Sequence, residues 1–123
     1  MTDEKTVLLI DDDSRNIFAL TAVLKAKGFR IVTASSAQEG IQHLHNNKGI
    51  KVVLLDMMMP EMDGYEAIRF IRSDEKIAGI PVIAVTAQAM IGDRERCLEA
   101  GANEYVSKPI DVDFLLQVLN RYN

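Results

Sequence analysis

Short apolar runs in this sequence repeatedly end at a side chain that can take part in chemistry. The residues at these ends are Asp11, Asp12, Asp56, Thr86 and Lys108. Together they offer a carboxylate nucleophile, two further carboxylates, a hydroxyl and an ammonium. Transfer of a phosphoryl group onto an acid requires these groups, and Asp56 is the candidate acceptor.

The stretch from 52 to 65, VVLLDMMMPEMDGY, contains this candidate acceptor. Its first four residues are apolar, which is typical of a strand covered on both faces of a parallel sheet. Pro60 cannot donate a hydrogen bond within a sheet, and Asp63-Gly64 favours a tight turn with positive φ. The chain therefore leaves the sheet soon after Asp56, at the edge where parallel sheets bind ligands. An acid that only caps the next helix is the structural alternative.

Strands that alternate with helices are needed to position these residues. Apolar runs predict strands at 6–10, 29–34, 51–56, 81–86 and 104–107. Helical spacing and capping residues predict helices that begin near Asp13 or Ser14, Ser35 or Ser36, Glu66, Asp93, and Asp111 or Asp113. The pattern predicts a single domain over residues 1–123, with an α/β flavodoxin-like (βα)5 doubly wound parallel sheet in the order 2-1-3-4-5.

In this strand order the first and third strands are neighbours, so Asp11, Asp12 and Asp56 would crowd into one cleft. Two like charges about 4 Å apart repel by roughly 4 kcal/mol at an effective dielectric of 20, so this group of acids needs a cation. Mg²⁺ is expected, because it prefers hard oxygen ligands. Lys108 would add a positive charge. The structural alternatives are a helix cap for the first acids, a strand position for Thr86 and a surface charge for Lys108.

Composition limits the classes of function. The 123 residues are 48% hydrophobic and 26% charged, which is typical of a globular protein, and no apolar run is long enough to span a membrane. Residues 1–6 lack the character of a signal peptide, so we expect a cytoplasmic protein. The net charge of −4 argues against a nucleic-acid surface. The single Cys97, with His43 and His45 two residues apart, does not predict a zinc site.

Four motifs resemble those of the bacterial response-regulator receiver family: LLIDDD, VVLLDMMMPEMDGYEAIRFIR, PVIAVTA and GANEYVSKP. The resemblance covers essentially the whole chain. It implies a signalling switch that accepts a phosphoryl group from a histidine kinase or a histidine phosphotransfer protein in a Mg²⁺-dependent reaction. It implies no enzyme beyond self-phosphorylation from small donors and self-dephosphorylation. A monomer, or a weak dimer that depends on phosphorylation, is expected.

The resemblance also assigns a role to each residue of the site. It makes Asp56 the phosphoacceptor. It gives the Mg²⁺ ligands as Asp11, Asp12, Asp56 and the backbone carbonyl of Met58. It implies that Thr86 hydrogen-bonds the phosphoryl group and that Lys108 pairs with it.

Switching is also implied by the resemblance. Tyr105 matches the aromatic residue whose rotamer follows Thr86, and the Lys108-Pro109 bond is expected to be cis. The surface expected to change comprises the fourth helix, fifth strand and fifth helix, including Ile91. The segment from Ala87 to Gly92 is small, apolar and without period, which predicts a mobile loop.

Two other classes of function fit the sequence less well. A haloacid-dehalogenase-like phosphatase also uses a strand-end Asp with Mg²⁺, but it needs a second acid two residues later, where this chain has Met58. The sequence also lacks room for a cap domain. A nucleotide-binding module would need a glycine-rich loop after the first strand, where this chain has acids. Within the receiver interpretation, both a stand-alone regulator and a receiver of a hybrid kinase fit.

Met58 and Gln88 are expected to flank the path of a water molecule that attacks the phosphoryl group. Met58 has only a weak thioether acceptor, and Gln88 carries no charge that would make it a base. Neither side chain is suited to activate water. The sequence therefore predicts slow hydrolysis, which suits a stable signal or back-transfer in a relay.

Overall fold

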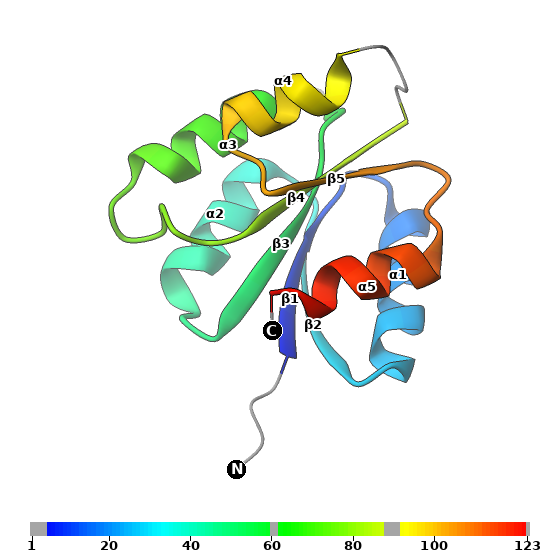
Figure 1. Cartoon of the computed structure of the whole chain (residues 1–123). Helices are drawn as coiled ribbons and strands as arrows, with labels where there is room; N and C mark the ends of the chain where they lie inside the picture. The colour runs from blue at the N-terminus through cyan, green and yellow to red at the C-terminus, as the bar shows by residue number, and fades with distance from the viewer. Residues whose placement is uncertain (1–4, 60–61, 88–91, 123) are drawn as a thin grey trace.

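The structure is a computed structural model that describes residues 5–59, 62–87 and 92–122 of the chain. Its strands are β1 (Lys5–Ile10), β2 (Phe29–Ala34), β3 (Ile50–Asp56), β4 (Val82–Thr86) and β5 (Glu104–Ser107). Its helices are α1 (Ser14–Ala26), α2 (Ala37–Asn46), α3 (Gly64–Ser73), α4 (Asp93–Ala100) and α5 (Val112–Asn120). Strands and helices alternate along the described chain, as the apolar runs predict (Figure 1).

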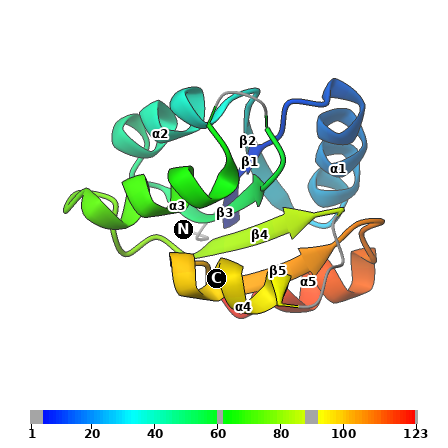
Figure 2. The ribbon, with the colours of Figure 1, turned by 90° about the horizontal axis from the view of Figure 1, so that it is seen from above.

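The strands form one parallel sheet in the order β2-β1-β3-β4-β5, which confirms the predicted flavodoxin-like (βα)5 fold. Helices α1 and α5 cover one face of this sheet, and α2, α3 and α4 cover the other (Figure 2). Because every strand is parallel, all the strands end at the same edge of the sheet. The chain leaves each strand for the following helix at that edge.

Side chains alternate along β1 between two cores. Val7 and Leu9 pack in the core beneath α1 and α5. Leu8 and Ile10 pack in the core beneath the other three helices. The apolar run of β3 divides in the same way, because successive side chains of a strand point to opposite faces. The two strands that lead to the candidate site are therefore held from both sides.

Side-chain caps fix where several helices begin. Asp13 caps α1, Ser36 caps α2 and Asp111 caps α5, each by accepting a hydrogen bond from a backbone N–H of the first turn. Each is one of the two residues that the sequence offered for that position. Gly101, with φ of 119°, ends α4 in the left-handed region, where a residue without Cβ is favoured.

The start of α3 differs from the sequence prediction. The helix begins at Gly64, capped by Asp63, rather than near Glu66. Among the described residues, positive φ occurs at three other glycines, so the expected positive φ at Gly64 is wrong. The reason for glycine is close packing: a Cβ on Gly64 would lie 2.7 Å from Cα of Met57. Gly64 therefore lets α3 pack directly on the chain after the candidate acceptor.

Arg72 joins three segments at the edge where the strands begin. Its guanidinium donates to the carbonyl of Gly101 from Nε at 3.0 Å and from a terminal nitrogen at 2.7 Å. The other terminal nitrogen donates to the carbonyls of Ala78 and Ile80, each at 2.6 Å. A fifth bond of 2.8 Å goes to the side-chain oxygen of Asn103. We call this guanidinium and its four acceptors the Arg72 node.

No described helix has the length and apolar character needed to cross a lipid bilayer. The predicted mobile loop at 87–92 includes residues 88–91, which lie outside the described residues. Its last residue, Gly92, has φ of 91° and precedes α4 without a side-chain cap.

Candidate functional site

Two neighbouring strands bring the predicted acids together. Ile10 and Leu55 are register partners on β1 and β3, so Asp11 and Asp56 both follow this paired position. Ligand oxygens of Asp11, Asp12 and Asp56 all lie within 4.8 Å of one another. We call these three residues the acidic cluster. It occupies the edge of the sheet at which the strands end.

The acids differ in burial. Asp11 is 2% exposed and Asp56 is 5% exposed, whereas Asp12 lies in solvent. One oxygen of Asp11 accepts a hydrogen bond of 2.8 Å from the backbone N–H of Asp13. Its other oxygen accepts a longer bond of 3.4 Å from the Asn16 side chain. The sequence interpretation did not include Asn16, although its place in the first turn of a helix that follows two acids is a usable signal.

Lys108 reaches the acidic cluster from β5. Its ammonium lies 3.8 Å from an oxygen of Asp11 and 3.8 Å from an oxygen of Asp56. The backbone N–H of Lys108 donates to the carbonyl of Thr86 at 2.8 Å, and the following peptide bond to Pro109 is cis. The ammonium is thus directed toward two acids at once, without a short hydrogen bond to either.

The pKa of Asp56 reflects this environment. The pKa of this carboxyl is raised from 3.8 to about 6, and burial is the main cause. Repulsion from Asp11 also raises the pKa, whereas the Met58 N–H and the Lys108 ammonium lower it. The ammonium therefore compensates only part of the negative charge, and the site favours an additional cation.

Thr86 and Tyr105 lie on neighbouring strands. Thr86 is buried at the last position of β4, where its register partner is Ser107. Tyr105 is the partner of Ala84 and is partly buried against the core beneath α2, α3 and α4. Burial raises the pKa of the Tyr105 hydroxyl, and the negative charge of Asp93 adds to this effect. The two predicted switch residues therefore come from adjacent strands on one side of Asp56.

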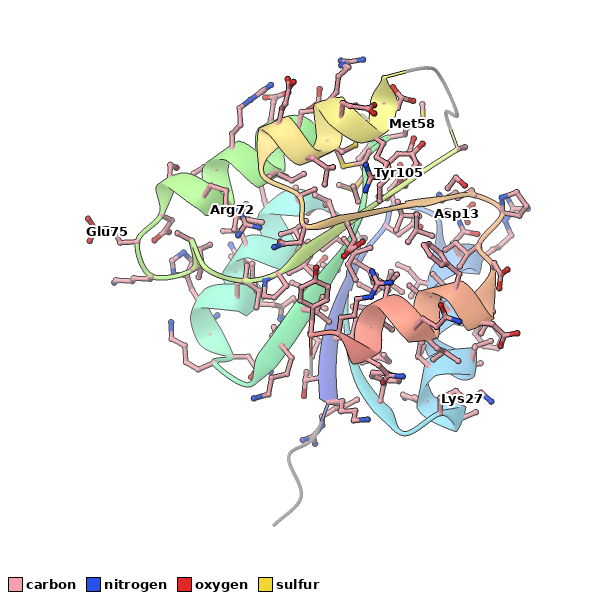
Figure 3. All side chains as sticks on the ribbon, viewed as in Figure 1. Asp13, Lys27, Met58, Arg72, Glu75 and Tyr105 are labelled. Carbon is pink, nitrogen blue, oxygen red and sulfur yellow. The ribbon has the colours of Figure 1, made fainter. Side chains whose placement is uncertain are left out.

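Met58 lies at the rim of the acidic cluster. Its backbone N–H donates to an oxygen of Asp56 at 3.0 Å, and the residue is 49% exposed. Figure 3 shows Met58 and Asp13 at one end of the sheet and Lys27 at the other. Gln88 and Ile91, which the sequence interpretation also singled out, lie outside the described residues.

The histidines and the cysteine lie apart from this site. His43 is 3.7 Å from Glu39 within α2, and His45 is 2.8 Å from the carboxylate of Asp74. The thiol of Cys97 is buried, and its sulfur lies 3.9 Å from the hydroxyl of Tyr65. His45 and Cys97 therefore make contacts between separate segments, whereas His43 makes a contact within α2.

Comparison with known proteins gives one family. The family model described as the response regulator receiver domain matches residues 7–120. The polar-differentiation response regulator DivK of Brucella ovis is 33% identical over 118 residues, which are 96% of this chain and 95% of DivK. The family match and this relative each span nearly the whole chain.

Two further relatives belong to kinases. Hybrid signal transduction histidine kinase I of Dictyostelium discoideum is 38% identical over 120 residues, which cover 93% of this chain and 7% of that kinase. The receiver domain of sensor histidine kinase PA1611 from Pseudomonas aeruginosa is 34% identical with a TM-score of 0.87, and 97% of each chain is covered. That structure has a magnesium ion coordinated in its active site cleft.

Proposed function

Because this chain belongs to the response regulator receiver domain family, we propose that it is a two-component signalling switch in which Asp56 accepts a phosphoryl group. The observation that carries this proposal is the acidic cluster, three carboxylates within 4.8 Å of one another, with Lys108 beside two of them. Asp56 is a nucleophile placed next to groups that bind negatively charged oxygens. We propose that the single domain spans residues 1–123.

The two oxygens of Asp56 have different surroundings. One accepts the hydrogen bond from the Met58 N–H, and the other faces the Lys108 ammonium at 3.8 Å. The first bond fixes the orientation of the carboxylate. The ammonium would pair with the oxygens of an incoming phosphoryl group, and the Thr86 hydroxyl would donate a hydrogen bond to the same group. Positioning and electrostatic compensation are the main contributions a protein makes to this reaction.

The donor set fits Mg²⁺. Three carboxylates, two of them buried, carry more negative charge than Lys108 compensates, and hard oxygen ligands are those that Mg²⁺ prefers. Asp11, Asp12, Asp56 and the backbone carbonyl of Met58 would hold the ion. Bound Mg²⁺ would neutralise charge on the phosphoryl oxygens during transfer. The magnesium ion in the related receiver of PA1611 supports this assignment.

We propose a histidine kinase or a histidine phosphotransfer protein as the phosphoryl donor. The two kinase relatives support this class of partner. Apart from self-phosphorylation by small donors and self-dephosphorylation, the protein would not turn over a substrate. The proposed location is the cytoplasm and the proposed state is a monomer or a weak phosphorylation-dependent dimer. The net charge of −4 supports protein rather than nucleic-acid partners.

Phosphorylation would change the surface formed by α4, β5 and α5. A phosphoryl group at Asp56 would draw Thr86 toward it, and Tyr105 on the adjacent strand would move into the space that Thr86 leaves. Chemical shifts of the phosphorylated protein should therefore change at this surface. Changes confined to α1 and α2 would contradict the proposed switch.

The test of the proposal uses acetyl phosphate with Mg²⁺ and an intact-mass measurement. The parent protein should gain one acid-labile phosphoryl group, and Asp56→Ala should gain none. Asp113→Ala, which removes an exposed acid from the first turn of α5, is the matched control and should behave like the parent. Equal modification of Asp56→Ala would refute the assignment. Catalytic turnover of phosphate esters by the parent would favour the phosphatase, although Met58 occupies the place of its second acid.

A further inference from the structure

Met58 presents a thioether to solvent beside the proposed phosphoacceptor. It is 49% exposed, whereas Met57 and Met59, its neighbours in the chain, are 5% and 7% exposed. Met62 is partly buried against the core beneath α2, α3 and α4. Among the methionines in the described residues, Met58 is therefore the most open to an oxidant in water.

The cysteine is a poor competitor for such an oxidant. Cys97 is the single cysteine of the sequence, and it is 1% exposed. Burial raises the pKa of its thiol, so the reactive thiolate is scarce at neutral pH. Among the sulfur atoms of the described residues, that of Met58 is therefore expected to be oxidised first.

Oxidation at this position would alter the rim of the acidic cluster. The backbone N–H of Met58 donates to an oxygen of Asp56 at 3.0 Å. The Met58 side chain is therefore attached to a residue that directly contacts the proposed acceptor. A thioether accepts hydrogen bonds only weakly, whereas a sulfoxide is polar and accepts them well. Oxidation would thus replace an apolar group that excludes water with one that can hold water near the phosphoryl group.

We propose that Met58 is a site of reversible oxidation, by which hydrogen peroxide shortens the lifetime of phosphorylated Asp56. A sulfur lone pair attacks one peroxide oxygen and the O–O bond breaks. The departing hydroxide takes the proton of the new S–OH group, leaving S=O and water. Sulfur loses two electrons and peroxide gains them. The oxidation site stands on exposure alone, and the effect on lifetime rests on the proposed function.

The first experiment maps oxidation in the unphosphorylated protein. Metal-free protein is treated with increasing hydrogen peroxide and digested with trypsin, and fragment ions locate the added oxygen within the peptide 52–69. Met58 should carry severalfold more sulfoxide than either buried neighbour. Met90 falls in a different peptide, 77–94, and does not disturb this reading. Equal or earlier oxidation of Met57 or Met59 would overturn the proposed site.

The second experiment measures the loss of the phosphoryl group by intact mass after the donor is removed. Peroxide treatment should speed the decay on the order of threefold to tenfold. Methionine sulfoxide reductase, supplied with a dithiol that is oxidised to a disulfide as the sulfoxide is reduced, should restore the original rate. Met58→Leu keeps the backbone carbonyl but removes the sulfur, so peroxide should not change its decay. Met58→Gln, with a permanent polar acceptor, should decay faster than Met58→Leu without peroxide.

The outcomes separate this proposal from the proposed function. An unchanged decay after oxidation of Met58, or the same peroxide effect in Met58→Leu, overturns the lifetime effect. A parent protein that takes up no phosphoryl group contradicts both the proposed function and the lifetime effect. The first experiment identifies the oxidised methionine in every case, because it needs no phosphorylation.

Discussion

The acidic cluster and the Arg72 node lie at opposite edges of the sheet, and they differ in how well the charge of each is compensated. At the Arg72 node, all five N–H donors of one guanidinium have acceptors, at 2.6 to 3.0 Å. At the acidic cluster, three carboxylates share one ammonium that lies 3.8 Å from two of them. The first arrangement is complete, and the second leaves charge uncompensated.

This difference is visible in the pKa of Asp56. The pKa of the carboxyl is about 6, because burial and repulsion from Asp11 destabilise the charged form more than Lys108 and the Met58 N–H stabilise it. A site that only stabilised the fold would gain nothing from this repulsion. Incomplete compensation of charge, more than burial of charge, therefore distinguishes the acidic cluster from the Arg72 node.

The largest change in stability is expected at the Arg72 node, where every donor has an acceptor. Arg72→Ala should lower the free energy of unfolding by about 3 kcal/mol, because it removes the Arg72 donors from the half-buried carbonyls of Ala78, Ile80 and Gly101. Urea unfolding followed by circular dichroism measures this loss. Arg69→Ala, an exposed arginine on the same helix, is the matched control and should change stability by less than about 0.5 kcal/mol. A loss of unfolding free energy no larger than that of Arg69→Ala would show that the hydrogen bonds of the Arg72 node do not stabilise the fold.

The next effect tests whether a cation completes the acidic cluster. Mg²⁺ at about one hundred times its dissociation constant should stabilise the parent by about 2.7 kcal/mol, seen as a rise in Tm. Asp12→Ala should remove most of this rise, because it deletes the exposed carboxylate of the cluster. Asp113→Ala should keep it. A rise that survives unchanged in Asp12→Ala would locate the metal elsewhere.

A third effect tests the repulsion without any metal. Asp56 has a raised pKa in the folded protein, so its contribution to stability is fully present below the unfolded value of 3.8 and is lost as pH rises through about 6. At about pH 7.5 with a chelator, Asp56→Asn should therefore raise the free energy of unfolding. The shift corresponds to about 3 kcal/mol at most, and screening by nearby water reduces the expected gain to about 1 to 2 kcal/mol.

The gain from Asp56→Asn should shrink as the pH is lowered from about 7.5 to about 5, since the parent then holds a proton on Asp56. Unfolding curves at both pH values give the comparison, with Asp113→Asn as the control for loss of a surface charge. If Asp56→Asn were destabilising at the higher pH, charge in the acidic cluster would already be compensated.

The smallest effect concerns the lifetime of the phosphoryl group at the rim of the cluster. Met58→Asn combined with Gln88→Glu places a polar group and a charged base beside the attack path. We expect decay on the order of tenfold faster than in the parent, because these side chains can hold and activate water. Intact-mass measurement of the decay provides the test. An equal or slower decay in the double variant would show that water positioning by these residues does not set the lifetime.

Apolar runs in the sequence mark the strands, and polar residues mark their ends. The flavodoxin-like order expected for alternating strands and helices then brings the acids together, as the structure confirms. The sequence was not sufficient at Gly64, where the dipeptide with Asp63 resembles a turn. The decisive contact there is the backbone of Met57, 2.7 Å from a would-be Cβ, and it exists only once α3 packs on that segment. The Arg72 node was missed for the same reason: its acceptors reach as far as Asn103 along the chain.

The direction of the first strand and the last helix has a practical consequence. β1 begins at Lys5 on the edge opposite the acidic cluster, and α5 returns to that edge, where the Tyr122 hydroxyl donates to Glu104 at 2.9 Å (Figure 1). A dye or a surface linker attached to the exposed Lys5 would therefore stand roughly 20 Å from the acidic cluster, the length of a six-residue strand. An attachment at Lys5 would leave the acidic cluster open to an incoming protein.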